Sequence, residues 1–273
     1  MNIHTLETIE ISAAGGVAEV RLNRPDKANA LNLAGWLDIR RAFDWVDAEP
    51  SVRVALLSGN GKHFCSGIDI SMLAGIADQV DDDCEGRKRE KLRRVILDLQ
   101  DTLTSLERCR KPVIAAVHGA CVGGAIDLIC AADIRLASAD ARFSIKEIDM
   151  GMTADVGTLQ RMPKLMPSGI VRELAFTGRD FSAEEAARWG FVNAVHPDRE
   201  SLTASARDMA SRIAAKSALS MRGIKEQLNY ARDHSVADGL NYVATWNAAM
   251  LMSSDLNEAV MSAMQGKTAK FRD

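Results

Sequence analysis

Two glycine-bearing loops and three later carboxylates are the groups in this sequence best suited to chemistry. The loops run over 63–69 (His-Phe-Cys-Ser-Gly-Ile-Asp) and 118–124 (His-Gly-Ala-Cys-Val-Gly-Gly), and each follows an apolar run and precedes a helical pattern. Glycine lets a backbone approach a ligand closely, and a helix start offers unpaired N–H groups. Together the loops predict two amides that polarise one carbonyl oxygen.

The three carboxylates follow the second loop. Asp127 comes three residues after Gly124, which places it on nearly the same helical face as that residue's amide. Glu147 is expected at the end of a short strand, and Asp155 at a predicted helix start. From spacing alone, Glu147 is equally typical of a surface acid, and Asp155 of a helix cap.

Other side chains that often carry chemistry favour structural roles here. Neither loop matches GxGxxG or GxxxxGK[ST], so the known nucleotide-phosphate patterns do not apply. No GxSxG elbow accompanies the histidines, and the tryptophans lie within apolar helical patterns. We therefore interpret the following as structural or core residues: His63, His118, His196, His234, Trp36, Trp45, Trp189 and Trp246.

Charge and cysteine usage exclude several classes of protein. Lys and Arg total 34 against 37 Asp and Glu, a net charge of -3, so no nucleic-acid partner is expected. The five cysteines show no CxxC spacing, which argues against a zinc site or disulfide framework and for a reducing compartment. No export signal or membrane-length apolar run is visible. We expect a cytoplasmic protein with no membrane partner and no metal.

The elements that must position the loops alternate strands and helices. An antiparallel hairpin is expected from 9–12 and 17–22, and Asn32 can cap a helix that runs to about Val46. A strand is expected over 52–57. Helical spacing of apolar residues predicts a helix over 91–110, and the run 113–117 is typical of a buried parallel strand. This alternation predicts an α/β fold.

Beyond about Val195 the strand signals stop. A capping box of Ser182 with Glu185 starts one helix, and further helices are predicted over 202–213, 219–231, 236–251 and 256–264. We therefore divide the chain into a core, 1–195, that carries the site, and a helical region, 196–273. The acidic stretch 79–90 is either a segment lying over the site or a solvated face.

Both glycine loops resemble the oxyanion-hole segments of the crotonase, or enoyl-CoA hydratase/isomerase, superfamily. Arg24-Pro25 followed by Asn29-Ala30-Leu31 is similar to its N-terminal coenzyme-A segment, and the resemblance spans nearly the whole chain. It implies a crotonase-like ββα spiral core with a helical C-terminal trimerisation region. It also implies an acyl-CoA thioester substrate, homotrimers or homohexamers, and no cofactor beyond the coenzyme A of the substrate.

Three stretches narrow the resemblance to the dienoyl-CoA isomerase family. They are 123–129 (Gly-Gly-Ala-Ile-Asp-Leu-Ile), 146–149 (Lys-Glu-Ile-Asp) and 154–161 (Ala-Asp-Val-Gly-Thr-Leu-Gln-Arg), with further similarity over 230–236 and 240–247. Ala125 departs from the pattern, because that family often has glycine there. The resemblance implies isomerisation of 3,5-dienoyl-CoA to 2,4-dienoyl-CoA in fatty-acid β-oxidation.

The same resemblance implies roles for individual residues. The backbone amides of Ser66 and Gly124 would bind the thioester oxygen, and Asp127, Glu147 and Asp155 would form an acidic triad. We assign Asp155 as the base at C2 and Glu147 as the acid at C6, while Asp127 biases their protonation as a neighbouring like charge. The segments expected to bind coenzyme A contribute Lys27, Ala28, Ala30, Cys65, Ser66, Gly67, Ile68, Asp69 and Gly124.

Two other functions remain open from the sequence. An enoyl-CoA hydratase shares the fold and ligand but adds water between two acids; its pattern has glutamates at the positions of Asp127 and Glu147 and no acid at Asp155. A non-catalytic scaffold of the same fold should have lost an acid or an oxyanion loop, whereas this sequence retains them. Asp155 therefore discriminates between the isomerase and the hydratase.

Overall fold

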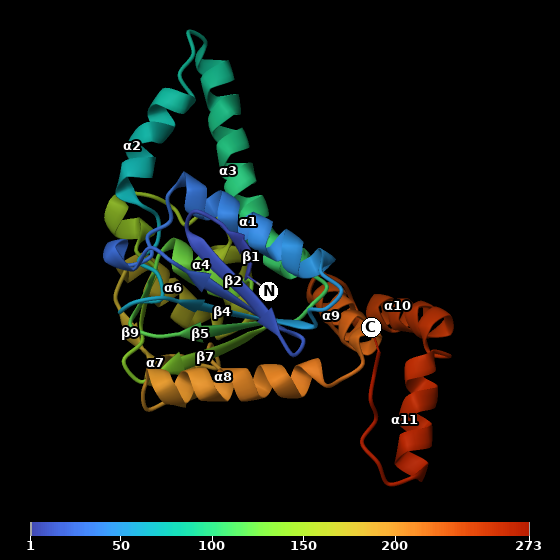
Figure 1. Cartoon of the computed structure of the whole chain (residues 1–273). Coiled ribbons are helices and arrows are strands. Elements are labelled where there is room, and N and C mark those ends of the chain that lie inside the picture. Colours follow the sequence, from blue (N-terminus) through green and yellow to red (C-terminus); the bar gives the residue numbers. More distant parts are fainter. Residues whose placement is uncertain (1, 273) are drawn as a thin grey trace.

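A seven-stranded sheet is the framework that carries both glycine loops. The computed structural model describes residues 2–272 and orders these strands β1-β2-β3-β4-β5-β7-β10 (Figure 1). The predicted hairpin is confirmed, with Gly15 and Gly16, both at positive φ, in its turn. From β3 onward the neighbours pair in parallel. The strands are β1 (Asn2–Thr5), β2 (Ile9–Ala14), β3 (Val17–Leu22), β4 (Val54–Gly59), β5 (Val113–Val117), β7 (Ile134–Ser138) and β10 (Ala194–His196).

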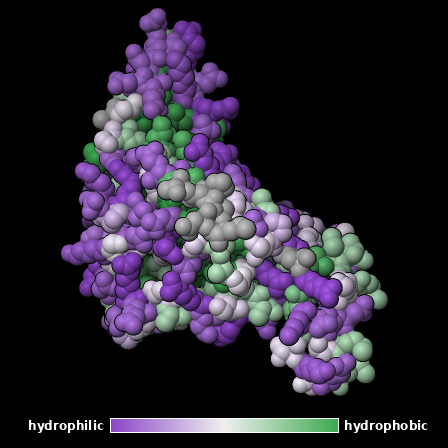
Figure 2. Space-filling model, viewed as in Figure 1, coloured by the Kyte–Doolittle hydropathy of each residue, from purple (hydrophilic) through white to green (hydrophobic). Residues whose placement is uncertain are grey.

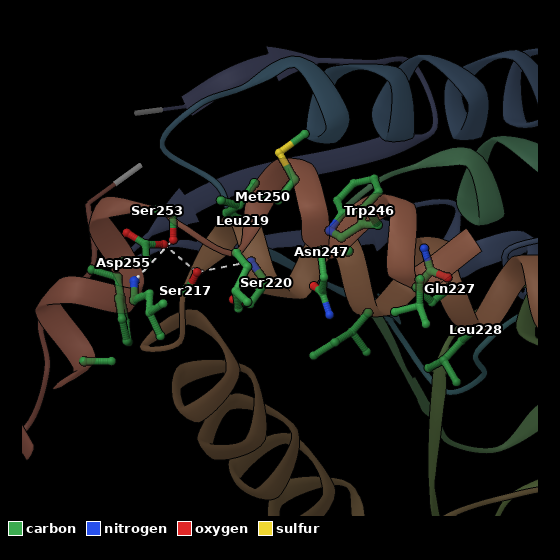
Figure 3. Close-up of a pocket in the computed structure, with 17 residues that line it drawn as sticks. Ser217, Leu219, Ser220, Gln227, Leu228, Trp246, Asn247, Met250, Ser253 and Asp255 are labelled. Carbon is green, nitrogen blue, oxygen red and sulfur yellow. Dashed lines mark hydrogen bonds between the residues drawn. The ribbon is translucent and has the colours of Figure 1, made fainter. Parts of the chain in front are cut away.

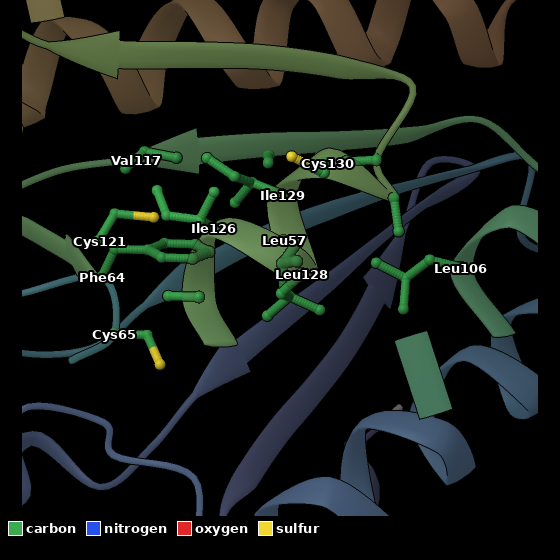
Figure 4. Close-up of a cluster of buried hydrophobic side chains, with 14 of the residues drawn as sticks. Leu57, Phe64, Cys65, Leu106, Val117, Cys121, Ile126, Leu128, Ile129 and Cys130 are labelled. Atoms are coloured by element: carbon green, nitrogen blue, oxygen red, sulfur yellow. The ribbon is translucent and has the colours of Figure 1, made fainter. Parts of the chain in front are cut away.

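Both faces of the parallel strands are buried. Successive side chains of β4 and β5 enter two separate apolar clusters, because side chains alternate across a strand. On one face Leu57 and Val117 belong to the cluster that surrounds α4 (Gly124–Cys130), a helix whose residues are all buried (Figure 4). A continuous apolar run is typical of a parallel strand that is buried on both faces. The run 113–117 forms such a strand, β5, as predicted.

The opposite face of the sheet is covered by α8 (Arg199–Ala214). The apolar residues of this helix share a cluster with Leu56 and Ala116 of the sheet, and Figure 1 shows the helix running along it. A division of the chain at residue 195 separates α8 from the strands that it covers. By packing, the core continues to Ala214, through the helix residues Leu202, Ala206, Ala210 and Ala214.

A second sheet, ordered β6-β8-β9, connects the elements that carry the acids. Its strands are β6 (Ala120–Val122), β8 (Arg142–Ser144) and β9 (Phe181–Ser182). β6 leads directly into α4, and β8 ends shortly before Glu147. Buried Phe143 and Phe181 stack with ring centroids 5.2 Å apart, and Phe191 meets Phe143 edge-on at 5.9 Å. This aromatic cluster fixes β8 and β9 against the core.

Two long helices lie together on the side of the sheet that holds α4. Asn32 caps α1 (Leu33–Ala48) as predicted, since its side chain accepts a hydrogen bond from the Gly35 amide at 2.8 Å. α3 (Glu85–Arg108) packs along α1 but begins earlier than the predicted residue 91. The first turns of α3 are polar and carry no apolar stripe, so periodicity could not reveal them.

α2 (Ile70–Gln79) and the first half of α3 form a hairpin that projects from the body (Figure 1). Most side chains over 81–90 are exposed, and Figure 2 shows a hydrophilic surface over this tip. Asp82 bridges Arg87 and Lys91 there at 2.8 and 3.1 Å. Of the two interpretations of 79–90, the structure therefore favours the solvated face.

Three C-terminal helices project on another side: α9 (Ala218–Asp233), α10 (Val236–Met250) and α11 (Ser254–Met264). Buried Lys225 anchors α9, because its ammonium donates to the Leu106 and Lys111 carbonyls and pairs with Asp133 at 2.8 Å. No helix within 2–272 combines the length and apolar character needed to cross a membrane. The remaining elements are η1 (Pro25–Lys27), η2 (Glu147–Met150), α5 (Thr158–Arg161), η3 (Met162–Lys164), α6 (Ser168–Thr177) and α7 (Ala183–Arg188).

Candidate active site

The two glycine loops lie side by side and hydrogen-bond to each other. The amide of Phe64 donates to His118 at 2.8 Å, and that of Cys65 donates to Ala120 at 3.0 Å. Val122 returns a bond to the Cys65 carbonyl at 3.1 Å. The loop that follows β4 therefore extends the pairing of β6 and ends beside the start of α4. This arrangement brings the predicted amide-bearing segments together.

The N-terminal segment 24–31 is bonded to the opposite edge of the first loop. Leu31 donates to the Gly67 carbonyl at 2.8 Å and accepts from Asp69 at 2.9 Å. Buried Asn29, at a left-handed φ of 55°, donates its side-chain amide to three loop carbonyls, those of Asn60, His63 and Phe64. The segments predicted to bind coenzyme A, 27–30 and 65–69, are thus parts of one hydrogen-bonded unit.

The structure corrects one of the two predicted oxyanion donors. The Ser66 amide donates to the Ala28 carbonyl at 3.0 Å, so it is occupied by the bond that joins the two segments. Within the described residues, the Ile68 and Gly124 amides have no acceptor. A Cβ built on Gly124 would lie 3.9 Å from the Ile68 nitrogen, which shows how closely the two converge. Ile68 therefore replaces Ser66 as the partner of Gly124.

Gly67 is the residue that makes this convergence possible. It has φ +90°, and a Cβ there would lie 2.6 Å from the Val122 carbonyl oxygen and 3.4 Å from the Gly124 nitrogen. No side chain fits between the loops at this point. The sequence shows the glycine at 67, but it does not show the hydrogen bond from the Ser66 amide to Ala28. Because of that bond, the Ile68 amide and not the Ser66 amide is left without an acceptor among the described residues.

Asp127 is a fully buried carboxylate on α4. One of its oxygens accepts a hydrogen bond from the Thr158 amide, and the other has no partner in the described part of the chain. Burial raises the pKa of Asp127 to about 6, while Thr158 and the charge of Arg161 oppose the rise. The carboxylate stays ionised at neutral pH, in the centre of an apolar helix.

Glu147, the first residue of η2, lies beside the second glycine loop. A Cβ built on Gly123 would lie 3.4 Å from its Oε1, and its Oε2 is buried with no partner among the described residues. Burial, and next the charge of Asp127, raise the pKa of Glu147 to about 7. A plain surface acid would show neither feature, so the structure favours the chemical interpretation of Glu147.

Asp155 lies in the segment before α5, and its side chain is the most exposed of the three acids. The residue at the cap position of α5 is Gly157, so Asp155 does not serve as the helix cap. Burial raises its pKa, and its charge contributes to the raised pKa values of Asp127 and Glu147. The three carboxylates thus form one electrostatic cluster that titrates as a coupled set.

Two histidines and one tryptophan support the loops. His63 accepts from the Ala120 amide at 3.1 Å through Nδ1, and His118 meets the Gly61 carbonyl at 3.1 Å through Nε2. The Trp36 ring is buried, and its edge would lie 3.5 Å from a Cβ on Gly124. These side chains hold the loops in place, in agreement with the structural roles predicted for them.

Comparison with known proteins identifies the family. The model of the enoyl-CoA hydratase/isomerase family matches residues 12–271. The chain belongs to the enoyl-CoA hydratase/isomerase family. An enoyl-CoA hydratase structure from Bacillus anthracis is 28% identical, with a TM-score of 0.87 over 97% of this chain and 98% of that one. The predicted crotonase fold is confirmed.

Relatives within this family carry a narrower name. The peroxisomal Delta(3,5)-Delta(2,4)-dienoyl-CoA isomerase of Arabidopsis thaliana is 46% identical over 98% of this chain and 96% of that protein. The mitochondrial enzyme of the same name from Homo sapiens is 43% identical over 98% of this chain and 82% of that protein. The resemblance to the dienoyl-CoA isomerases is therefore confirmed.

The predicted cytoplasmic location is wrong by the same comparison. The Arabidopsis relative is named as peroxisomal and the human relative as mitochondrial. Absence of a visible export or transit pattern was the basis of the prediction. The lack of such a pattern carries no weight against relatives of this similarity that are named for two organelles.

We predict that Gly67→Ala lowers kcat/KM for an acyl-CoA substrate by about 10²-fold or more, the cost of losing one oxyanion donor. The added methyl group would push the loop off the Val122 carbonyl and displace the Ile68 amide. Gly75→Ala is the control, because a Cβ at that helical position meets nothing within 4 Å. Steady-state kinetics on folded protein decide the matter, and near-normal turnover of Gly67→Ala would contradict the assigned geometry.

Proposed function

We propose that this protein isomerises 3,5-dienoyl-CoA to 2,4-dienoyl-CoA in fatty-acid β-oxidation. Relatives with that name cover almost the whole chain at 43–46% identity. The observation that carries the proposal is the third acid: Asp155 shares an electrostatic cluster with Asp127 and Glu147. Hydration needs two acids around one water, whereas a proton shift over five carbons needs a base and an acid that are well separated.

The site supplies a group for each step of this reaction. The Ile68 and Gly124 amides bind the thioester oxygen, and Asp155 removes the C2 proton. The electrons pass to the thioester oxygen as a dienolate, and Glu147 then delivers a proton to C6. Each oxyanion donor contributes roughly 3–4 kcal/mol to such a transition state, and a positioned acid or base adds about 10²–10⁴-fold. The only coenzyme required is the coenzyme A of the substrate.

The charges of the resting site suit these roles. Asp127, with a pKa of about 6, is ionised at neutral pH, and its charge keeps the proton on Glu147, with a pKa of about 7. Glu147 acts as an acid only when protonated, so turnover falls as the pH rises through about 7. After each turnover Asp155 holds a proton and Glu147 lacks one. Because Asp155 is exposed, it can lose its proton to water, and Glu147 takes a proton back from the solvent before the next turnover.

The reaction is tested by offering purified protein a 3,5-dienoyl-CoA and following the absorbance of the conjugated 2,4-dienoyl product. A 2-enoyl-CoA hydration assay runs alongside. We expect isomerisation to dominate, because the site has a third acid that hydration does not use. Dominant hydration would support the hydratase alternative, and no turnover of either substrate by folded protein that binds acyl-CoA would support a scaffold.

We predict that Asp155→Asn removes most isomerase activity and leaves coenzyme-A affinity nearly unchanged. The amide has almost the same size but cannot accept the C2 proton, so the loss appears in kcat and not in binding. Turnover and coenzyme-A binding are measured on the same sample. If Asp155 only supports the local backbone, the Asn variant keeps near-normal turnover, and the assigned base is then wrong.

We also propose that the C-terminal helices pack against further copies of this chain in a homotrimer or a homohexamer. A cavity of about 470 Å³ lies between α9, α10 and α11, where Leu228, Trp246 and Met250 face it (Figure 3). Neighbouring apolar side chains are exposed, including Leu228 at 67% and Val236 at 81%. A group of exposed apolar side chains marks an interaction surface. Figure 2 shows apolar residues on the surface of these helices.

Sedimentation velocity tests the assembly. We expect a mass of three or six times the 29.6 kDa of the chain. Leu228→Glu should dissociate the assembly, because it places a charge on the exposed apolar face. Leu92→Glu, on the projecting α3 hairpin and 39% exposed, is the matched control. A monomeric wild type, or a Leu228→Glu variant that assembles normally, would contradict the proposal.

A further inference from the structure

Thr158 has a buried hydroxyl next to the buried carboxylate of Asp127, and the reaction described above does not use it. The residue is 1% exposed, and its amide donates to Oδ1 of Asp127. Its hydroxyl oxygen is buried and has no partner with hydrogen-bond geometry among the described residues. Oδ2 of Asp127 and Oε2 of Glu147 are buried and unpartnered as well. Buried polar atoms are normally paired, so three such atoms in one site need an explanation.

An ion pair between Arg161 and Glu107 fixes the segment that carries Thr158. Arg161, three residues after Thr158, donates to the Val156 carbonyl at 3.3 Å. The guanidinium of Arg161 also donates two hydrogen bonds of 2.9 Å to the carboxylate of Glu107 on α3. Gln100 of α3 donates to the Asp155 carbonyl at 2.6 Å. The segment 155–161 is therefore fastened to α3, and Thr158 is the residue of that segment that contacts Asp127.

The groups around Asp127 leave few other means of stabilising its charge. Two acids lie near it, Glu147 from η2 and Asp155 from the segment before α5, and the charge of Asp155 raises the pKa of Asp127. The charge of Arg161 lowers the pKa of Asp127, and that guanidinium is already paired with Glu107. The nearby thiols of Cys121 and Cys130 stay neutral, because burial raises their pKa values.

We propose that Thr158 is a positioning residue that donates its amide and its hydroxyl to Asp127 and so leaves the proton of the acidic pair on Glu147. Among the described residues, the hydroxyl of Thr158 lacks an acceptor and Oδ2 of Asp127 lacks a donor, so a hydrogen bond between the two residues would satisfy both buried groups. The amide of Thr158 already donates to Asp127 and lowers the pKa of its carboxyl group. The ionised Asp127 in turn raises the pKa of Glu147, the acid that delivers the C6 proton.

The catalytic consequence rests on the proposed isomerase function. When the hydroxyl is removed, the pKa of Asp127 rises and part of the enzyme holds its proton on Asp127 instead of on Glu147. That form cannot protonate C6. A hydrogen bond to a charged group has an energy that corresponds to a pKa change of about one to two units. The Asp127 titration therefore moves to higher pH by about that amount, and kcat falls on the plateau where the pair holds one proton, while KM is kept.

The experiment compares Thr158→Val and Thr158→Ala with Thr158→Ser. Val and Ala keep the amide and lose the hydroxyl, whereas Ser keeps both donors and should retain the wild-type Asp127 titration and kcat. Thr177→Val, at an exposed threonine on α6, is the control for a threonine hydroxyl elsewhere. The readouts are pH profiles of kcat and kcat/KM with 3,5-dienoyl-CoA, and infrared titration of the carboxyl groups, with Asp127→Asn identifying the Asp127 band.

We expect both hydroxyl-free variants to raise the pH of the Asp127 titration and to lower kcat, whereas Ser keeps both at the wild-type values. If Val and Ala lose activity while the Asp127 titration stays at the wild-type pH, Thr158 serves packing alone and the proposal is wrong. The infrared titration needs no turnover. It therefore tests Thr158 even if the wild-type protein proves inactive on 3,5-dienoyl-CoA, an outcome that would count against the proposed function instead.

Discussion

The burial of a charged carboxylate at Asp127 is the constraint on which the rest of the site depends. An isolated ionised acid in an apolar helix is unfavourable, and it would ordinarily take up a proton. Here burial raises the pKa of Asp127 only to about 6, because Thr158 and Arg161 oppose the effect. The remaining charge is then available to act on Glu147. One buried charge thus sets the protonation of the neighbouring acid.

The oxyanion site depends on a different physical principle, the pairing of backbone groups. Three segments, 24–31, 63–69 and 118–124, bond edge to edge, so most amides in them have an acceptor within the fold. The exceptions that matter are Ile68 and Gly124. Amides fixed by neighbours that are fully bonded cannot rotate away when charge develops on the ligand. This preorganisation is the usual source of oxyanion stabilisation.

Local features of the fold could be predicted from the sequence, and features that depend on distant partners could not. The hairpin at Gly15-Gly16 and the Asn32 cap follow from turn and cap chemistry within a few residues. The first turns of α3 were missed because they are polar. The packing of α8 on the sheet was missed because its apolar stripe does not say which surface it covers.

The same distinction holds for the site. The acids Asp127, Glu147 and Asp155 were found because their types and order match a family pattern, and the structure places all three in one electrostatic cluster. The donor assignment of Ser66 was wrong because a contact with Ala28, 38 residues earlier, uses its amide. Thr158 carried no sequence signal of its own, since only the fold brings its amide to Asp127.

The central claim is that separate carboxylates exchange protons at the two ends of one dienolate. Its most direct test is the position of deuterium after incubation of 3,5-dienoyl-CoA with the enzyme in D₂O. The account predicts deuterium at C6 of the product. It also predicts that Glu147→Gln still exchanges the C2 hydrogens of the substrate, whereas Asp155→Asn does not. If Asp155→Asn exchanges C2 normally while Glu147→Gln has lost that exchange, the base and the acid are assigned the wrong way round, and the account fails.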